Sequence, residues 1–216
     1  MLVSTLHELP VAVIGGRRLD PATVTPPHRA VGIRVEPLPT TRAHPPAVAI
    51  VGAHGGAGTS TLARWWAPAA DCEQSWPGSP QTTQRVVVAA RLCLPGLIAC
   101  ADRLREWHAG AAPEGVEVVG VVLSAARPGR VPAPVRRYRA VVEDLAEHVW
   151  QIGWHDELIE RELSELAEFS PFDPAPQRRA RLTEAVPLDV HHVGSELIDA
   201  LARTTKNPID QHDSEK

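Results

Sequence analysis

The feature that most constrains the fold of this chain is an alternation between short apolar runs and segments that can form amphipathic helices. The apolar runs lie at residues 47–51, 86–90 and 116–123. Runs that are apolar at almost every position are typical of strands buried on both faces. Helix-forming segments follow at residues 59–67, from near Pro95 and from Pro134. This alternation predicts βαβ units and a mostly parallel sheet covered by helices, an α/β fold.

Shorter elements complete the expected domain. Residues 148–152 predict a fourth strand, and Asp156 and Asp189 are each suited to cap a following helix. Residues 68–84 predict a loop between the first helix and the second strand. Neighbours on a helix point about 100° apart, so one of the adjacent tryptophans at residues 65–66 is expected to be exposed.

The length of 216 residues favours one core domain with extensions. Residues 1–46 contain eight of the 21 prolines, which predicts a proline-rich arm or linker, although a strand at residues 31–35 is also compatible with the sequence. Residues 47–203 form the expected α/β domain. Residues 204–216 are polar and predict a flexible tail.

Composition argues against several classes of function. The net charge is −4 and the only lysines are Lys206 and Lys216, so a nucleic-acid partner is not expected. The three cysteines form no CxxC pair, which is typical of a reducing compartment. No apolar run reaches the roughly 18 residues of a membrane span, and the Met1 end does not resemble a signal peptide. We therefore expect a cytoplasmic protein.

The stretch VGAHGGAGTST at residues 51–61 lies between a predicted strand and a predicted helix. In that setting, backbone N–H groups and the start of the helix can hold a phosphate. The candidate binding residues are Gly55, Gly56, Ala57, Gly58, Thr59, Ser60 and Thr61. Against the template GxxxxGK[ST], Gly58 and Ser60 match, whereas Thr59 stands at the lysine position. A dinucleotide-binding GxGxxG pattern does not fit.

Residues 54–61, HGGAGTST, resemble the deviant loop KGGxGK[ST] of ParA/MinD-type P-loop ATPases with both lysines replaced. The resemblance continues through VVVAARLCLPGLIACADRLREW, EVVGVVLSAARPGR and VWQIGWHDELIERELSEL, and covers residues 47–167. The loop and the pair Trp76-Pro77 are also similar to those of a group of bacterial proteins from GC-rich genomes. The resemblance implies a three-layer P-loop-like domain. It is shortened, because the family has two further strands where this chain has residues 68–84.

The resemblance also bears on function. Phosphoryl transfer depends on the loop lysine and on Mg²⁺ to neutralise developing charge. This chain lacks both lysines, and no carboxylate at the metal position is recognisable, Asp71 being the only nearby aspartate. We assign no catalytic and no metal-binding residue. We expect a degenerate relative without hydrolytic activity, an adaptor or regulatory protein that binds a protein partner. The resemblance alone implies a link to plasmid maintenance, transfer or segregation.

A second interpretation stays open at this point. Arg91 ends a predicted buried strand, at the edge where α/β sheets hold ligands, and could replace the missing lysine in binding ATP or ADP. In the first interpretation the glycines only form a tight turn, no cofactor is bound, and Arg91 pairs with an acidic neighbour.

A group of arginines is harder to assign from sequence. Its members are Arg127, Arg130, Arg136, Arg137 and Arg139. Five glutamates follow within residues 157–168, and we expect ordinary ion pairing between the two groups.

Overall fold

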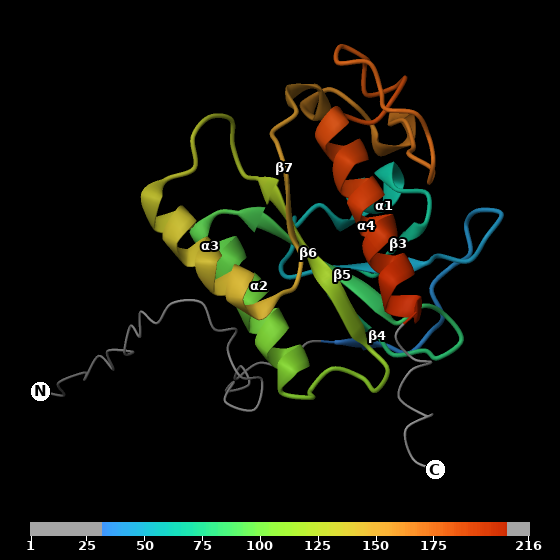
Figure 1. Cartoon of the computed structure of the whole chain (residues 1–216), viewed down its shortest axis with the longest axis vertical. Coiled ribbons are helices and arrows are strands. Elements are labelled where there is room, and N and C mark those ends of the chain that lie inside the picture. The colour runs from blue at the N-terminus through green and yellow to red at the C-terminus, as the bar shows by residue number, and fades with distance from the viewer. Residues whose placement is uncertain (1–31, 207–216) are drawn as a thin grey trace, which may run out of the picture.

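The computed structural model of the chain describes residues 32–206, with side chains to residue 203. Its centre is a sheet of five strands, ordered β3-β2-β5-β6-β7, in which all neighbours are parallel. The strands are β2 (Val48–Gly52), β3 (Ala69–Asp71), β5 (Arg85–Leu92), β6 (Glu117–Ala125) and β7 (Val149–Ile152). The predicted parallel α/β sheet is therefore confirmed (Figure 1).

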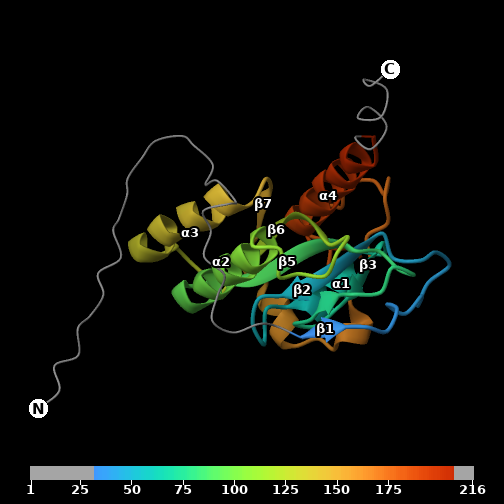
Figure 2. The ribbon, with the colours of Figure 1, turned by 90° about the horizontal axis from the view of Figure 1, so that it is seen from below.

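Helices cover both faces of the sheet and make three layers. On one face α1 (Thr59–Trp65) and α4 (Leu188–Lys206) share a core with alternate strand residues such as Ile50. On the other face α2 (Leu94–His108) and α3 (Ala133–Leu145) pack on the intervening residues, such as Val51. Ile50 and Val51 are both fully buried, as a strand covered on both faces requires. In two views that differ by a turn of 90°, α2 and α3 lie side by side (Figures 1 and 2).

The strand order locates the expected position of a ligand. The second strand of the sheet along the chain, β3, lies on one side of β2, and β5, β6 and β7 follow on the other side. The connections therefore leave β2 and β5 toward opposite faces. In sheets of this kind ligands bind beyond the carboxyl ends of the strands, near the point where the order reverses. That point lies where the glycine-rich loop follows β2.

The segment at residues 68–84 is more than the predicted loop. Its first residues form β3, which pairs with β2 in the register Ile50 to Asp71. Further on, β4 (Trp76–Pro77) pairs with β1 (Ile33–Arg34) in a separate two-stranded ladder. These strands have three and two residues, too short for a hydrophobic period to reveal them.

Three local predictions are wrong. Asp156 begins a single 3₁₀ turn, η2 (Asp156–Ile159), and a second, η3 (Leu163–Glu165), follows in place of one helix. Asp189 lies inside the first turn of α4 and not before it, and its Oδ1 accepts from the N–H of Val190. Both tryptophans are buried, because Trp66 ends α1 in an extended conformation and so no longer follows helical geometry.

The described part of the predicted arm lies against the domain. Leu38 is 3% exposed and belongs to the core beneath α2. The Arg42 guanidinium binds Glu168 and donates to the carbonyl oxygens of Ala63 and Ala69. The first residues of the predicted arm and the last of the predicted tail, 1–31 and 207–216, lie outside the described residues. No helix among residues 32–206 is long and apolar enough to cross a membrane.

Candidate functional site

The glycine-rich loop connects β2 to α1, as predicted. The strand ends at Gly52 and the helix begins at Thr59. Gly56 and Gly58 have φ angles of 76° and 92°, in the left-handed region that favours glycine. Gly58 precedes α1 and offers no side chain to cap it. The first N–H groups of a helix have no intrahelical partner, and at the start of α1 the cap residue supplies no side-chain acceptor for them.

His54, near the start of the glycine-rich loop, connects the loop to β5. The backbone N–H of Arg91 donates to Nε2 of His54 at 3.1 Å. Because Nε2 accepts, the ring proton sits on Nδ1, which lies 2.8 Å from the carbonyl oxygen of Gly55 and donates to it. The imidazole thus joins two backbone segments. Sequence reasoning missed this role, because the partner of His54 is a main-chain group that no sequence pattern marks.

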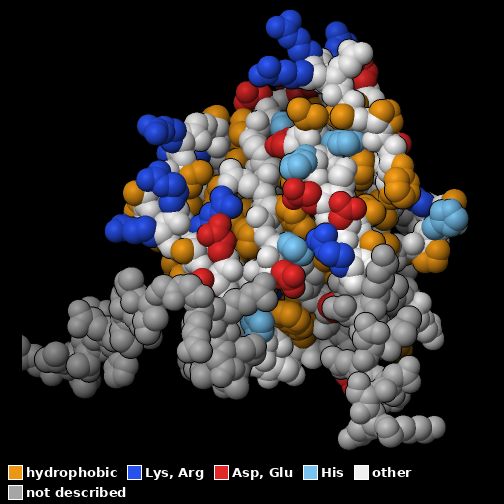
Figure 3. All heavy atoms as spheres, in the orientation of Figure 1, with side chains coloured by type: hydrophobic (Ala, Val, Ile, Leu, Met, Phe, Trp, Pro, Cys, Tyr) orange, Lys and Arg blue, Asp and Glu red, His pale blue; other side chains and the backbone are white. Residues whose placement is uncertain are grey.

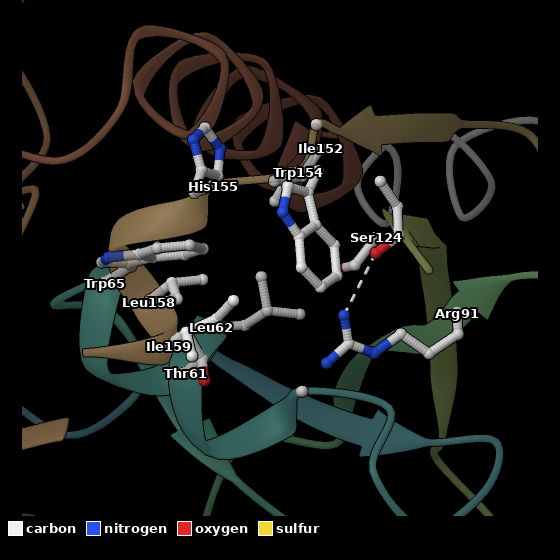
Figure 4. A pocket seen from close by; sticks show the side chains of 13 residues that line it. Thr61, Leu62, Trp65, Arg91, Ser124, Ile152, Trp154, His155, Leu158 and Ile159 are labelled. Atoms are coloured by element: carbon white, nitrogen blue, oxygen red, sulfur yellow. Dashed lines mark hydrogen bonds between the residues drawn. The ribbon is translucent and has the colours of Figure 1, made fainter. Parts of the chain in front are cut away.

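Arg91 lies where the sequence placed it but binds different partners. Its Nε donates to the carbonyl oxygen of Gly56 at 3.0 Å, and Nη1 donates to that of Ala125 at 3.1 Å. The predicted acidic neighbour is not the partner. The remaining terminal nitrogen has no hydrogen bond to a described residue and points toward the start of α1 (Figure 4). Arg91 thus ties the loop to the end of β6.

Ser60 faces the carboxylate of Asp71, although the sequence showed no recognisable carboxylate at the metal position. Its Oγ donates to Oδ2 of Asp71 at 2.5 Å, and Oδ1 accepts from the N–H of Glu73 at 2.8 Å. The reason is β3: a parallel strand beside β2 delivers its last residue to the same edge of the sheet as the loop. Among the residues that the structure describes, no group of three or more His, Cys, Asp or Glu side chains could hold a metal ion.

A cleft of about 200 Å³ opens beside the loop, at the carboxyl ends of the strands. In Figure 4 the ring of Trp154 stands between Leu62 and Ser124, and Trp65 lies near His155. Of the predicted site residues, this first cleft includes Gly58, Thr61 and Arg91. Its other lining residues are Leu62, Trp65, Ser124, Ala125, Ile152, Gly153, Trp154, His155, Leu158 and Ile159. Gly55, Gly56, Ala57, Thr59 and Ser60 do not line it.

The far wall of the first cleft is held to α4 by an acidic side chain. Oδ1 of Asp189 lies 3.1 Å from Nε2 of His155, and Oδ2 accepts from the N–H of Gly153 at 2.7 Å. Burial alone would raise the pKa of Asp189, but the contact with His155 and the backbone hydrogen bonds from Gly153 and Val190 lower it below its ordinary value. The carboxylate therefore stays charged and fixes the loop after β7.

The base of the glycine-rich loop rests on a buried arginine of α2. Arg103 is 3% exposed, and its Nη2 donates to the carbonyl oxygens of Gly52 at 3.2 Å and Gln74 at 3.0 Å. Its Nη1 binds Glu106, and the guanidinium lies 5.3 Å from the ring centroid of Trp76. Burial lowers the pKa of Arg103, while Glu106 opposes that shift.

Comparisons of the chain with protein-family models, with curated proteins and with solved structures gave no match.

Proposed function

We propose that this chain is an adaptor or regulatory interaction protein, built on a P-loop-like α/β domain that does not hydrolyse nucleotides. The observation that carries the proposal is the bonding of Arg91 to the carbonyl oxygens of Gly56 and Ala125. A loop that grips phosphate turns N–H groups inward and keeps its cation for the ligand. Here the loop turns a carbonyl toward the cation, and the cation serves as an internal support.

Hydrolysis would need more than the loop. Each preorganised group that stabilises the charge of the transition state is worth about 10²–10³ in rate. Lys206 is the only lysine between residues 32 and 206, and it ends α4 on a segment remote in sequence from the loop. The link to plasmid maintenance, transfer or segregation rests on the resemblance alone.

A second candidate function is Mg²⁺-dependent binding of ATP or ADP. The pair formed by Ser60 and Asp71 favours it, since a hydroxyl and a carboxylate at this edge of the sheet are oxygen ligands of the kind Mg²⁺ takes. The aromatic walls of the first cleft, Trp65 and Trp154, could face a nucleobase. The terminal nitrogen of Arg91 that makes no hydrogen bond to a described residue could bind a phosphate in place of the loop lysine.

Titration of the purified full chain with ATP and ADP, with and without Mg²⁺, separates the two candidates. Isothermal calorimetry reports binding, and a phosphate assay reports hydrolysis. The adaptor proposal predicts no nucleotide binding below millimolar concentrations and no phosphate release. Mg²⁺-dependent binding that Ser60→Ala and Asp71→Asn both abolish would replace it by the second candidate.

The matched variants Arg91→Ala and Arg105→Ala test the support role. Arg105 lies on α2 and forms a surface pair with Asp102, so its loss should change stability little. Arg91→Ala removes two charge-assisted hydrogen bonds from a half-buried side chain and should lower the free energy of unfolding by about 1–2 kcal/mol. Equal stability of the two variants would show that Arg91 does not hold the loop.

A further inference from the structure

A second cleft of about 200 Å³ lies beside the first, with Trp154 in the wall of both. It opens at the carboxyl ends of β5 and β6, between the loop that follows β6 and the start of α3. Its apolar wall comes from Leu92, Val131 and Val135 together with Trp154. Arg127 and Arg130 line the same cleft. This second cleft therefore combines an apolar wall with two cations.

Most of the arginines around the second cleft have no acidic partner among residues 32–203, whose side chains the structure describes. The side chains of Arg127, Arg130 and Arg137 have no hydrogen bond or ion pair with any described residue, and the side chain of Arg136 donates only to the backbone carbonyl oxygen of Val131. Figure 3 shows Lys and Arg side chains gathered over α3 and the loop before it.

Three of the five glutamates that were expected to pair with these arginines lie against other arginines. Glu168 binds Arg42 and Arg64, while Glu157 and Glu165 lie against Arg161. Of the five arginines, Arg139 alone has an acidic partner within the described part of the chain, and that partner is Glu143. The prediction of mutual pairing between the two groups is therefore wrong.

The position of these charges is unfavourable for the isolated chain. The first turn of α3 contains no acidic residue. The start of a helix carries a partial positive charge, and cations placed there repel it. Arg136 and Arg137 lie at that end of α3, in a chain whose net charge is −4. An anionic partner would remove this repulsion.

We propose that the second cleft binds an acidic segment of a protein partner, with carboxylates on Arg127 and Arg130 and an apolar side chain against Leu92, Val131 and Val135. Arginine forks match carboxylate geometry, and the apolar wall gives a binding site to a side chain that nucleic acid does not carry. The inference rests on the proposed function only in taking the partner to be a protein. It requires nothing of the glycine-rich loop.

The test is fluorescence anisotropy with a fluorescein-labelled acidic peptide that carries leucines among its glutamates and aspartates. A peptide of equal charge with glycine for leucine and a labelled DNA duplex serve as comparison probes. The double variant Arg127→Gln with Arg130→Gln should bind the leucine-containing peptide about tenfold more weakly than wild type. The control removes the same charge elsewhere, by Arg179→Gln with Arg203→Gln; both arginines are exposed and lie outside the cleft.

The proposal holds if the first double variant loses affinity, the control keeps it, and the glycine peptide binds more weakly than the leucine peptide. It is overturned by equal losses in both double variants, by equal binding of the two peptides, or by preference for the DNA duplex. Absence of peptide binding to wild type also overturns it. None of these outcomes depends on nucleotide binding. The peptide experiment therefore tests the second cleft separately from the nucleotide and phosphate assays, which test the proposed function.

Discussion

Replacing Arg103 by methionine should destabilise the domain more than any substitution of a surface arginine. Arg103 and its partner Glu106 are 3% and 2% exposed. Nη1 of Arg103 lies 3.2 Å from Glu106, and Nη2 donates to Gly52 and Gln74. Methionine fills much of the same space but donates no hydrogen bond. The carboxylate of Glu106 would then remain buried without its arginine.

The expected magnitude follows from that burial. Breaking one side of a buried ion pair costs about 3–5 kcal/mol, because the remaining charge keeps its desolvation penalty. Solvent screening does not reduce this figure here, since neither side chain is exposed. For a domain of this size each kcal/mol lowers the melting temperature by about 2–4 °C, so Arg103→Met should melt about 6–20 °C below wild type.

Urea denaturation of Arg103→Met, Glu106→Gln and the double variant measures the pair. The double variant should be less destabilised than the sum of the two single variants, since it buries neither charge of the pair. Arg105→Met is the control, because Arg105 pairs with Asp102 at the surface of the same helix. If Arg103→Met and Arg105→Met unfold at the same urea concentration, the buried pair does not support the base of the loop.

Three further predictions concern other parts of the domain. Gly96→Ala should cost about 1–3 kcal/mol in thermal melts, since its Cβ would lie 2.2 Å from the carbonyl oxygen of Arg91; an unchanged melt would contradict this close approach. The lowered pKa of Asp189 contributes stability at pH values above its ordinary pKa of 3.8, and this stability is lost as the pH falls through the folded pKa. Asp189→Asn should therefore flatten the acid limb of a urea-stability profile. Burial raises the pKa of Cys72 to about 11, so Cys93, the half-exposed thiol, should react first with Ellman's reagent near neutral pH, and Cys93→Ser should remove that fast phase.

The main sheet was predictable because a strand buried on both faces is apolar at almost every position. The runs at residues 47–51, 86–90 and 116–123 became β2, β5 and β6 with ends shifted by a few residues at most. The glycine-rich loop was predictable for a related reason. Left-handed φ angles at Gly56 and Gly58 restrict the residue type, so the requirement of the turn is visible in the sequence.

The chemistry around the loop was not predictable in the same way. Ser60 contacts Asp71 because the three-residue strand β3 pairs with β2. A strand of that length shows no hydrophobic period in the sequence. His54 and Arg91 bind main-chain groups, and a carbonyl oxygen is present at every position of a sequence. The sequence identified Arg91 as a candidate cation of the site. Its hydrogen-bond partners could not be predicted, because one of them, the carbonyl oxygen of Ala125, depends on where β6 ends.

The presence of arginine rather than lysine at position 91 has a physical consequence for the loop. An ammonium group is a compact point charge, whereas a guanidinium holds its donors in a planar fork. With Nε on Gly56 and Nη1 on Ala125, Arg91 spans the gap between the loop and β6 and still directs its last nitrogen toward α1. A ligand that attracted this cation away would release both carbonyl oxygens and loosen the loop. A cation used in this way stabilises the empty loop, and binding of an anion there has to compete with the fold itself.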